Sequence, residues 1–125
     1  HKQFINNIDQ LIFSLDKEGL NELQPDVLIT IGGMVVSKKV KQFLRSFPPN
    51  QHWHVDPYSK LDTYHVLSHY FKISPQLFFS QFFFLTESVK GSYHQKWLEV
   101  KAKRKRSHKA ILDRVTYSDL KVFEL

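Results

Sequence analysis

The sequence predicts an α/β fold, in which a parallel sheet with helices on both sides is followed by one long helix. Residues 27–31, VLITI, form a nearly all-apolar and mostly β-branched run, which is typical of a strand buried on both faces of a parallel sheet. A predicted helix and a second short strand follow within about 30 residues, as in a βαβ unit with a right-handed crossover. Residues 93–115 contain neither Pro nor Gly, which favours a single long helix.

Length and composition indicate one globular domain of ordinary type. The chain has 125 residues, of which 42% are hydrophobic and 24% charged, and it contains no cysteine. These values are typical of a soluble globular protein. The lack of cysteine excludes disulfides and thiol chemistry, which agrees with a cytoplasmic location. No apolar run approaches the roughly 20 residues that a membrane span requires, so we expect no membrane span.

Two short helical segments are expected before the first strand. Residues 4–15 carry apolar side chains at helical or mixed spacing. Asp16 is placed to cap a second short helix that runs to Leu23. Pro25 ends this region because the residue before a proline avoids the helical conformation.

A helix and a second strand follow the strand at residues 27–31. Ser37 is placed to cap a helix that runs to about Phe47, and Pro48-Pro49-Asn50 stops it. Its apolar stripe at positions i, i+3, i+4 and i+7 consists of Val40, Phe43, Leu44 and Phe47. Residues 52–56 are the predicted second strand, which Pro57 ends.

A third strand and a further helix complete the predicted α/β part. Residues 61–71 alternate imperfectly, which predicts a strand centred on Tyr64–Ser68 and leaves a helix as the alternative. Ser74 followed by Pro75 is a helix start, and apolar residues continue that helix to Leu85. We expect its phenylalanines to pack against a neighbouring domain: Phe78, Phe79, Phe82, Phe83 and Phe84.

The long predicted helix is apolar at both ends and basic in the middle. Six of the eighteen Lys and Arg residues fall within residues 101–109, and the other twelve equal the twelve acidic residues in number. The net charge of +6 is therefore local. This basic block consists of Lys101, Lys103, Arg104, Lys105, Arg106 and Lys109. It is either the solvated face of a connector helix or a nucleic-acid patch, and its lack of interleaved aromatic residues argues against single-strand binding.

The end of the sequence carries the start of another element. Ser118 is expected to cap an amphipathic segment that reaches Leu125. Because the chain begins at His1 rather than at Met and ends inside this segment, we expect a piece of a longer protein.

The turn between the first strand and the following helix is the best candidate for a functional site. It contains Gly32, Gly33, Ser37, Lys38 and Lys39. A helix start supplies free backbone N–H groups, and lysines supply charge for a carboxylate or phosphate. On the residues alone, a plain strand-to-helix connection with solvated lysines is the simpler interpretation. A half-domain that binds NAD or FAD is an alternative, although the full dinucleotide-binding fingerprint is missing.

Four histidines and one aspartate are further candidate ligands. His52 and His54 share one face of a strand, and His65 and His69 would share a face if their segment were helical. Either pair could ligate zinc, but no third ligand stands at motif spacing, so ordinary surface or partly buried histidines are the simpler interpretation. Asp56 either binds a ribose or caps the following loop, and capping is favoured. No nucleophile-plus-base pair, carboxylate pair or metal motif is present.

Three segments in order carry a resemblance to a known family. These are PDVLITIGGMVVSKKVKQFLR, QHWHVDP and YSDLKVFEL. Their strand-Gly-x-x-x-Ser-Lys-helix turn, Trp-x-Val-Asp strand end and late segment resemble the thiamine-diphosphate-dependent synthase of menaquinone biosynthesis, 2-succinyl-5-enolpyruvyl-6-hydroxy-3-cyclohexene-1-carboxylate synthase, called the MenD family. The resemblance covers nearly the whole chain.

The resemblance implies a place for this chain within a three-domain enzyme. Members have a pyrimidine-binding domain, a central doubly wound (Rossmann-like) domain and a pyrophosphate-binding domain. Residues 1–86 would be the C-terminal half of the central α/β domain, residues 87–116 a linker helix and residues 117–125 the start of the pyrophosphate-binding domain. Half a sheet with an exposed central edge further implies a homo-oligomer.

The resemblance also implies an activity for the full enzyme. It would decarboxylate 2-oxoglutarate on thiamine diphosphate, with Mg²⁺ holding the diphosphate, and add the succinyl-semialdehyde unit to isochorismate. The family's basic pair, which helps to bind these acidic substrates, corresponds to Lys38 and Lys39, beside Ser37. Some members carry Lys-Arg there, and Lys39 lacks the bidentate fork of an arginine.

The family's metal-and-diphosphate motif and its catalytic glutamate are absent from this sequence. We therefore expect the catalytic, cofactor-binding and metal-binding residues to lie in the missing N- and C-terminal domains. The fragment alone is expected to be inactive and to bind no cofactor, and no nucleic-acid partner is expected.

Overall fold

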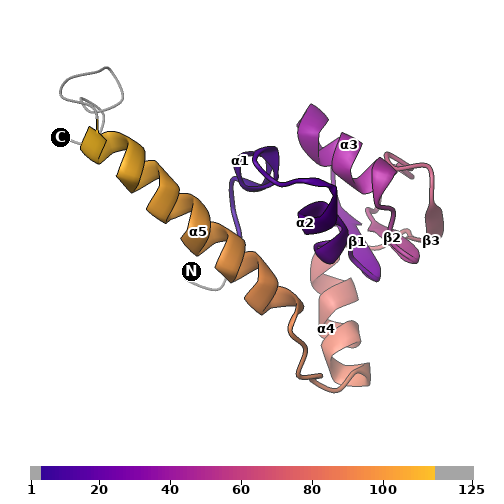
Figure 1. The fold of residues 1–125 in the computed structure, drawn as a ribbon. Coiled ribbons are helices and arrows are strands. Elements are labelled where there is room, and N and C mark those ends of the chain that lie inside the picture. The colour runs from indigo at the N-terminus through magenta and orange to yellow at the C-terminus, as the bar shows by residue number, and fades with distance from the viewer. Residues whose placement is uncertain (1–3, 115–125) are drawn as a thin grey trace. The chain divides into compact units, whose positions relative to one another are not determined.

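The computed structural model describes residues 4–114, which form two compact units (Figure 1). One unit spans residues 7–91 and contains the sheet with helices α1 to α4. The other contains residues 4–6 and the long helix α5. The predicted α/β class is confirmed. The predicted domain boundaries after residues 86 and 116 stay predictions.

The sheet consists, within the described residues, of three parallel strands in the order β1-β2-β3. Strand β1 is Val27–Ile31, β2 is Gln51–Val55 and β3 is Leu67–Phe71. The first two strands confirm the predicted βαβ unit, with Val27 opposite Gln51 and Ile31 opposite Val55.

The third strand lies further along the chain than the sequence predicted. The prediction centred it on Tyr64–Ser68, but β3 starts only at Leu67. Residues 61–66 form a loop in which His65 has a left-handed backbone with a φ of 61°. Alternation alone misplaced the strand because Tyr64 is a buried loop residue rather than a strand residue.

Helices α2, α3 and α4 begin where the sequence places their capping side chains, whereas α1 has no side-chain cap. Helix α1 is Ile8–Phe13, α2 is Lys17–Glu22, α3 is Lys38–Ser46 and α4 is Pro75–Leu85. The side chain of Asp16 accepts a hydrogen bond from the Gly19 N–H at 2.9 Å, and the Ser37 and Ser74 hydroxyls accept from N–H groups three residues later at 3.3 Å. These side chains satisfy N–H groups that have no partner inside the helix.

The sheet lies between α3 on one side and α4 on the other (Figure 1). On the α4 side, the ring centroids of Phe71 and Phe78 lie 5.0 Å apart, and those of Trp53 and Phe82 lie 6.4 Å apart. The other face of β2 carries His52 and His54, because successive strand side chains point to opposite faces. The core therefore has an aromatic layer on one side of the sheet and a polar pair on the other.

Strand β1 is less buried than its sequence predicted. Val27 is 47% exposed and Ile31 is 52% exposed, although the all-apolar run predicted burial on both faces. The physical reason is the strand order, because β1 has a neighbouring strand on only one side within the described residues.

Helix α5, Tyr93–Arg114, confirms the predicted long helix over its described length. Trp97 and Leu112 are buried, and the basic block is largely exposed. The predicted continuation to Val115 and the predicted segment from Ser118 to Leu125 lie outside the described residues. Among the described helices, none has the length and apolar content needed to cross a membrane.

Candidate functional site

The candidate site is the segment from Gly32 to Lys39, which joins the carboxyl end of β1 to the start of α3. The Gly32 N–H donates to the Val55 carbonyl at 3.3 Å, which ties the turn to β2. Gly32 has a φ of 71°, a conformation that costs other residues energy and glycine little. A glycine is therefore required where β1 turns away from the sheet.

The loop between the glycines and the helix is apolar and open to solvent. Met34 is 59% exposed, Val35 36% and Val36 87%. Ser37 then ends the loop, and its hydroxyl oxygen accepts from the Val40 N–H at 3.3 Å. Because that oxygen already accepts the capping hydrogen bond, the Ser37 hydroxyl can bind a ligand chiefly as a hydrogen-bond donor.

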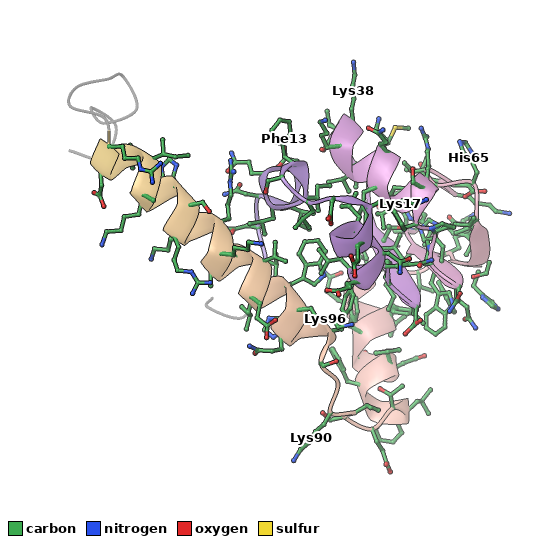
Figure 2. All side chains as sticks on the ribbon, in the orientation of Figure 1. Phe13, Lys17, Lys38, His65, Lys90 and Lys96 are labelled. Carbon is green, nitrogen blue, oxygen red and sulfur yellow. The ribbon has the colours of Figure 1, made fainter. Side chains whose placement is uncertain are left out.

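The two lysines at the start of α3 point in different directions. Figure 2 shows Lys38 extending from the first turn of α3 into open space. The Lys39 Nζ instead lies 5.0 Å from the centre of the Phe13 ring of α1, within the range of a cation–π contact. Adjacent helical residues lie about 100° apart around the axis, so the two amines do not converge on one ligand in this conformation.

Lys39 also lines a pocket of about 220 Å³ between α1, α2 and α3. The walls are mostly apolar and consist of Ile12, Phe13, Leu15, Leu20, Lys39, Gln42, Phe43, Ser46 and Phe47. Of the segment from Gly32 to Lys39, Lys39 alone lines this pocket. Of the predicted pair, Lys38 is therefore the better placed to serve a ligand at the turn.

The histidines do not form a metal site within residues 4–114, where no group of three or more His, Cys, Asp or Glu is placed to hold an ion. The idea that His65 and His69 share a helical face is wrong, because His65 lies in the loop and His69 on β3. His52 and His54 do share a face, but both are almost fully buried, at 0% and 1% exposed. The expectation of surface or partly buried histidines is therefore wrong for His52 and His54.

Asp56 caps the loop after β2, as favoured from the sequence. Its Oδ1 accepts from the Tyr58 N–H at 2.7 Å and from the Ser59 N–H at 3.3 Å. Asp56 is 8% exposed, and its backbone carbonyl accepts from the Tyr70 hydroxyl at 2.9 Å. These bonds fix the carboxyl end of β2 beside the Gly32 turn.

Comparisons with known proteins agree with this fold. Residues 1–123 match the family described as the middle domain of thiamine pyrophosphate enzymes. A protein of Flavobacterium johnsoniae is 44% identical over 99% of this chain and 22% of its own length. One of Flavobacterium psychrophilum is 38% identical over 100% of this chain and 23% of its own, and one of Christiangramia forsetii is 41% identical over 98% and 22%.

All three relatives are named 2-succinyl-5-enolpyruvyl-6-hydroxy-3-cyclohexene-1-carboxylate synthase. The resemblance to the MenD family noted from the three sequence segments is thereby confirmed. The chain spans about a fifth of the length of these curated relatives. The chain belongs to the family of thiamine pyrophosphate enzyme middle domains.

Proposed function

We propose that this chain is part of the central domain of a thiamine-diphosphate-dependent synthase of menaquinone biosynthesis. The full enzyme decarboxylates 2-oxoglutarate and adds the succinyl-semialdehyde unit to isochorismate, in the cytoplasm. The observation that carries this proposal is the match of relatives with that name across nearly the whole chain. Within this proposal, residues 1–86 form half of a larger central sheet and residues 87–116 link it to the next domain.

Lys38 is the residue of this chain proposed to meet the substrates. Both proposed substrates carry carboxylates, and Lys38 presents a charged, exposed amine at the start of α3, where backbone N–H groups also favour an anion. Ser37 is a weaker candidate because its oxygen already caps the helix. Lys39 is weaker because its amine lies over Phe13.

The charges at the turn from Gly32 to Lys39 do not fit a Mg²⁺ ion, and the described residues hold no group of three or more His, Cys, Asp or Glu placed for a metal. A Mg²⁺–diphosphate group needs oxygen ligands, and the charges at the Gly32 turn are lysines. Thiamine diphosphate would supply the carbanion chemistry in the full enzyme. The part of this chain is to bind and orient acidic substrate groups, and we assign the cofactor and Mg²⁺ to the other domains.

The test of this site is Lys38→Ala in the full-length enzyme. A charged hydrogen bond is worth about 1.5–3 kcal/mol, so kcat/KM for 2-oxoglutarate or for isochorismate is expected to fall by about tenfold or more. Stability should change by less than about 0.5 kcal/mol, because Lys38 is exposed. Steady-state kinetics with each substrate varied in turn gives the first value, and urea denaturation gives the second.

Lys41→Ala is the matched control, since it removes the same charge from α3 further from the turn. It is expected to leave kcat/KM within about twofold of the parent value. If Lys38→Ala leaves kcat/KM unchanged for both substrates, Lys38 does not belong to the site.

The isolated chain is predicted to bind no thiamine diphosphate and to release no CO₂ from 2-oxoglutarate. Isothermal titration of the 125-residue chain with thiamine diphosphate and Mg²⁺ checks the first point. The full-length enzyme, titrated in the same buffer, is the control that shows the assay can detect binding. Saturable binding to the isolated chain would mean that this chain carries cofactor contacts.

Two alternative functions have their own tests. A nucleotide-binding half-domain would use the Gly32 turn to hold a diphosphate, and titration with NAD, FAD and ADP would detect it. A nucleic-acid module would use the exposed basic block, and its binding would weaken steeply with salt. Tight nucleotide binding, or a retarded nucleic-acid complex at low salt, would favour the respective alternative over the synthase.

A further inference from the structure

Two buried histidines and the half-buried Thr30 form a hydrogen-bonded bridge between β1 and β2, which we call the Thr30 bridge. The Thr30 Oγ1 lies 2.8 Å from the Nε2 of His52 and 2.8 Å from the Nδ1 of His54. The two imidazoles are 0% and 1% exposed. Nothing in the proposed catalytic role uses these residues.

The second nitrogen of each imidazole is buried without a partner. Within the described part of the chain, the His52 Nδ1 and the His54 Nε2 accept and donate no hydrogen bond. Native proteins pair nearly all buried polar atoms, so two orphans on adjacent rings call for an explanation. An orphan nitrogen on a neutral ring costs far less than a buried, unpaired charge.

We propose that Thr30, His52 and His54 act as one neutral unit that joins β1 to β2 and that opens when it takes up a proton. In this unit the threonine hydroxyl, which has one hydrogen, donates to one imidazole and accepts from the other. If it donates to the His52 Nε2, both rings carry their hydrogen on Nδ1. If it donates to the His54 Nδ1, both rings carry it on Nε2. The geometry therefore couples the two rings, which share the same tautomer.

Protonation of the ring that accepts the hydroxyl hydrogen breaks this arrangement, because both nitrogens of that ring then carry a hydrogen. The hydroxyl can then no longer donate to that ring, and a charged N–H is left facing the core. Aromatic rings pack against both histidines, with Tyr64 at 5.5 Å from His52 and Tyr70 at 6.1 Å from His54 between ring centroids. A cation–π contact with such a ring is worth about 0.5–2 kcal/mol, which is less than the cost of burying an unpaired charged N–H.

The charged groups around the bridge do not reverse this conclusion. Burial lowers the pKa of His52 below its ordinary value of 6.5, Asp62 in the loop before β3 opposes this shift, and the nearby His54 adds to it. Arg45 of α3 donates to the Thr63 carbonyl at 2.8 Å, and the Asp56 Oδ1 accepts from the backbone of the following loop. In these hydrogen bonds neither the Arg45 guanidinium nor the Asp56 carboxylate contacts an imidazole.

The sign of the pH dependence follows from the lowered pKa of His52. The unfolded chain takes up a proton as the pH falls through 6.5, while the folded chain still resists it. Stability is therefore full above pH 6.5 and declines as the pH falls toward the pKa of the folded state. The bridge lies two residues before Gly32, so its opening loosens the strand end that carries the candidate site.

The first test reads the tautomers directly in the unmodified 125-residue chain. Two-dimensional NMR of ¹⁵N-labelled histidine at about pH 8 separates Nδ1–H from Nε2–H rings. The proposal predicts the same tautomer for His52 and His54. Different tautomers at the two rings would mean that the hydroxyl oxygen accepts from both, and the coupled unit would be ruled out.

The second test follows the same chain through an acid titration. The protection factor of the Thr30 amide hydrogen, which lies on the β1–β2 ladder, should fall at the pH where the imidazole signals of His52 report protonation. Protonation of both rings without any change in the Thr30 protection factor would overturn the proposal.

A variant pair separates the proton from the hydrogen bonds. Glutamine places an amide near the position of Nε2 and asparagine near that of Nδ1, so His52→Gln with His54→Asn keeps groups that bond Thr30 but cannot titrate. The acid loss of stability between about pH 8 and about pH 5 should largely disappear in the double variant. Thr30→Ser, which keeps the hydroxyl, is the control and should lose stability in acid like the parent. An unchanged acid loss in the double variant would contradict the proposal.

Discussion

Replacing Phe78 by alanine is expected to lower the free energy of unfolding by about 3–5 kcal/mol. Phe78 is 6% exposed, and its ring centroid lies 5.0 Å from that of Phe71 and 5.7 Å from that of Phe82. Truncation removes the ring at the contact between α4 and the sheet and leaves a cavity there. Urea denaturation of the chain, followed by circular dichroism, measures the change.

Phe84→Ala is the matched control on the same helix. Phe84 is 88% exposed, so the same truncation should change the free energy of unfolding by less than about 0.5 kcal/mol. Equal losses from the two variants would mean that α4 does not pack on the sheet through Phe78.

Strand β1 is expected to become an interior strand in the full-length protein. The Asp26 carbonyl accepts from the Gln51 N–H, and the Gly32 N–H donates to the Val55 carbonyl. Since backbone groups alternate in direction along a strand, even-numbered residues face β2. The N–H groups of Val27, Ile29 and Ile31 therefore face the open edge.

Amide hydrogen exchange tests this expectation residue by residue. In the 125-residue chain, Leu28 and Thr30 should be protected, whereas Ile29 should exchange quickly. In the full-length protein, Ile29 should slow by about a thousandfold, because another strand pairs with this edge. Protection that grows with the concentration of the isolated chain would instead show that a second copy covers it. Fast exchange of Ile29 in the full-length protein would contradict the proposal that residues 1–86 are half of a larger sheet.

The elements that depend on local signals could be predicted from the sequence. Asp16, Ser37 and Ser74 each cap the helix expected of them, because a capping bond joins residues three positions apart. The strand Val27–Ile31 was predicted to the residue, because a β-branched run between Pro25 and Gly32 has few other structures available to it.

The features that depend on distant residues could not be predicted in this way. The position of β3 is set by pairing with β2, including an irregularity between His52 and Trp53. The burial of His52 and His54 follows from their central strand and from Thr30 on a different strand. The sequence contains one indication of this burial, because both histidines alternate with Trp53 and Val55 on one short strand.

The candidate site was predicted in its position but not in its details. The turn at Gly32, the cap at Ser37 and the helix start at Lys38 stand where the residues indicated. From the sequence, Lys38 and Lys39 were expected to act as a pair, whereas in the structure the Lys39 amine lies over the Phe13 ring. That direction depends on where α1 packs, which residues 32–39 do not encode.

The most direct test of the proposed function is an assay of the full-length protein with thiamine diphosphate and Mg²⁺. The synthase proposal predicts that 2-oxoglutarate and isochorismate are consumed together, with release of CO₂ and formation of one product detectable by mass spectrometry. It also predicts that omission of either substrate or of the cofactor stops product formation. No product with both substrates and the cofactor present, together with tight binding of NAD or FAD, would contradict it.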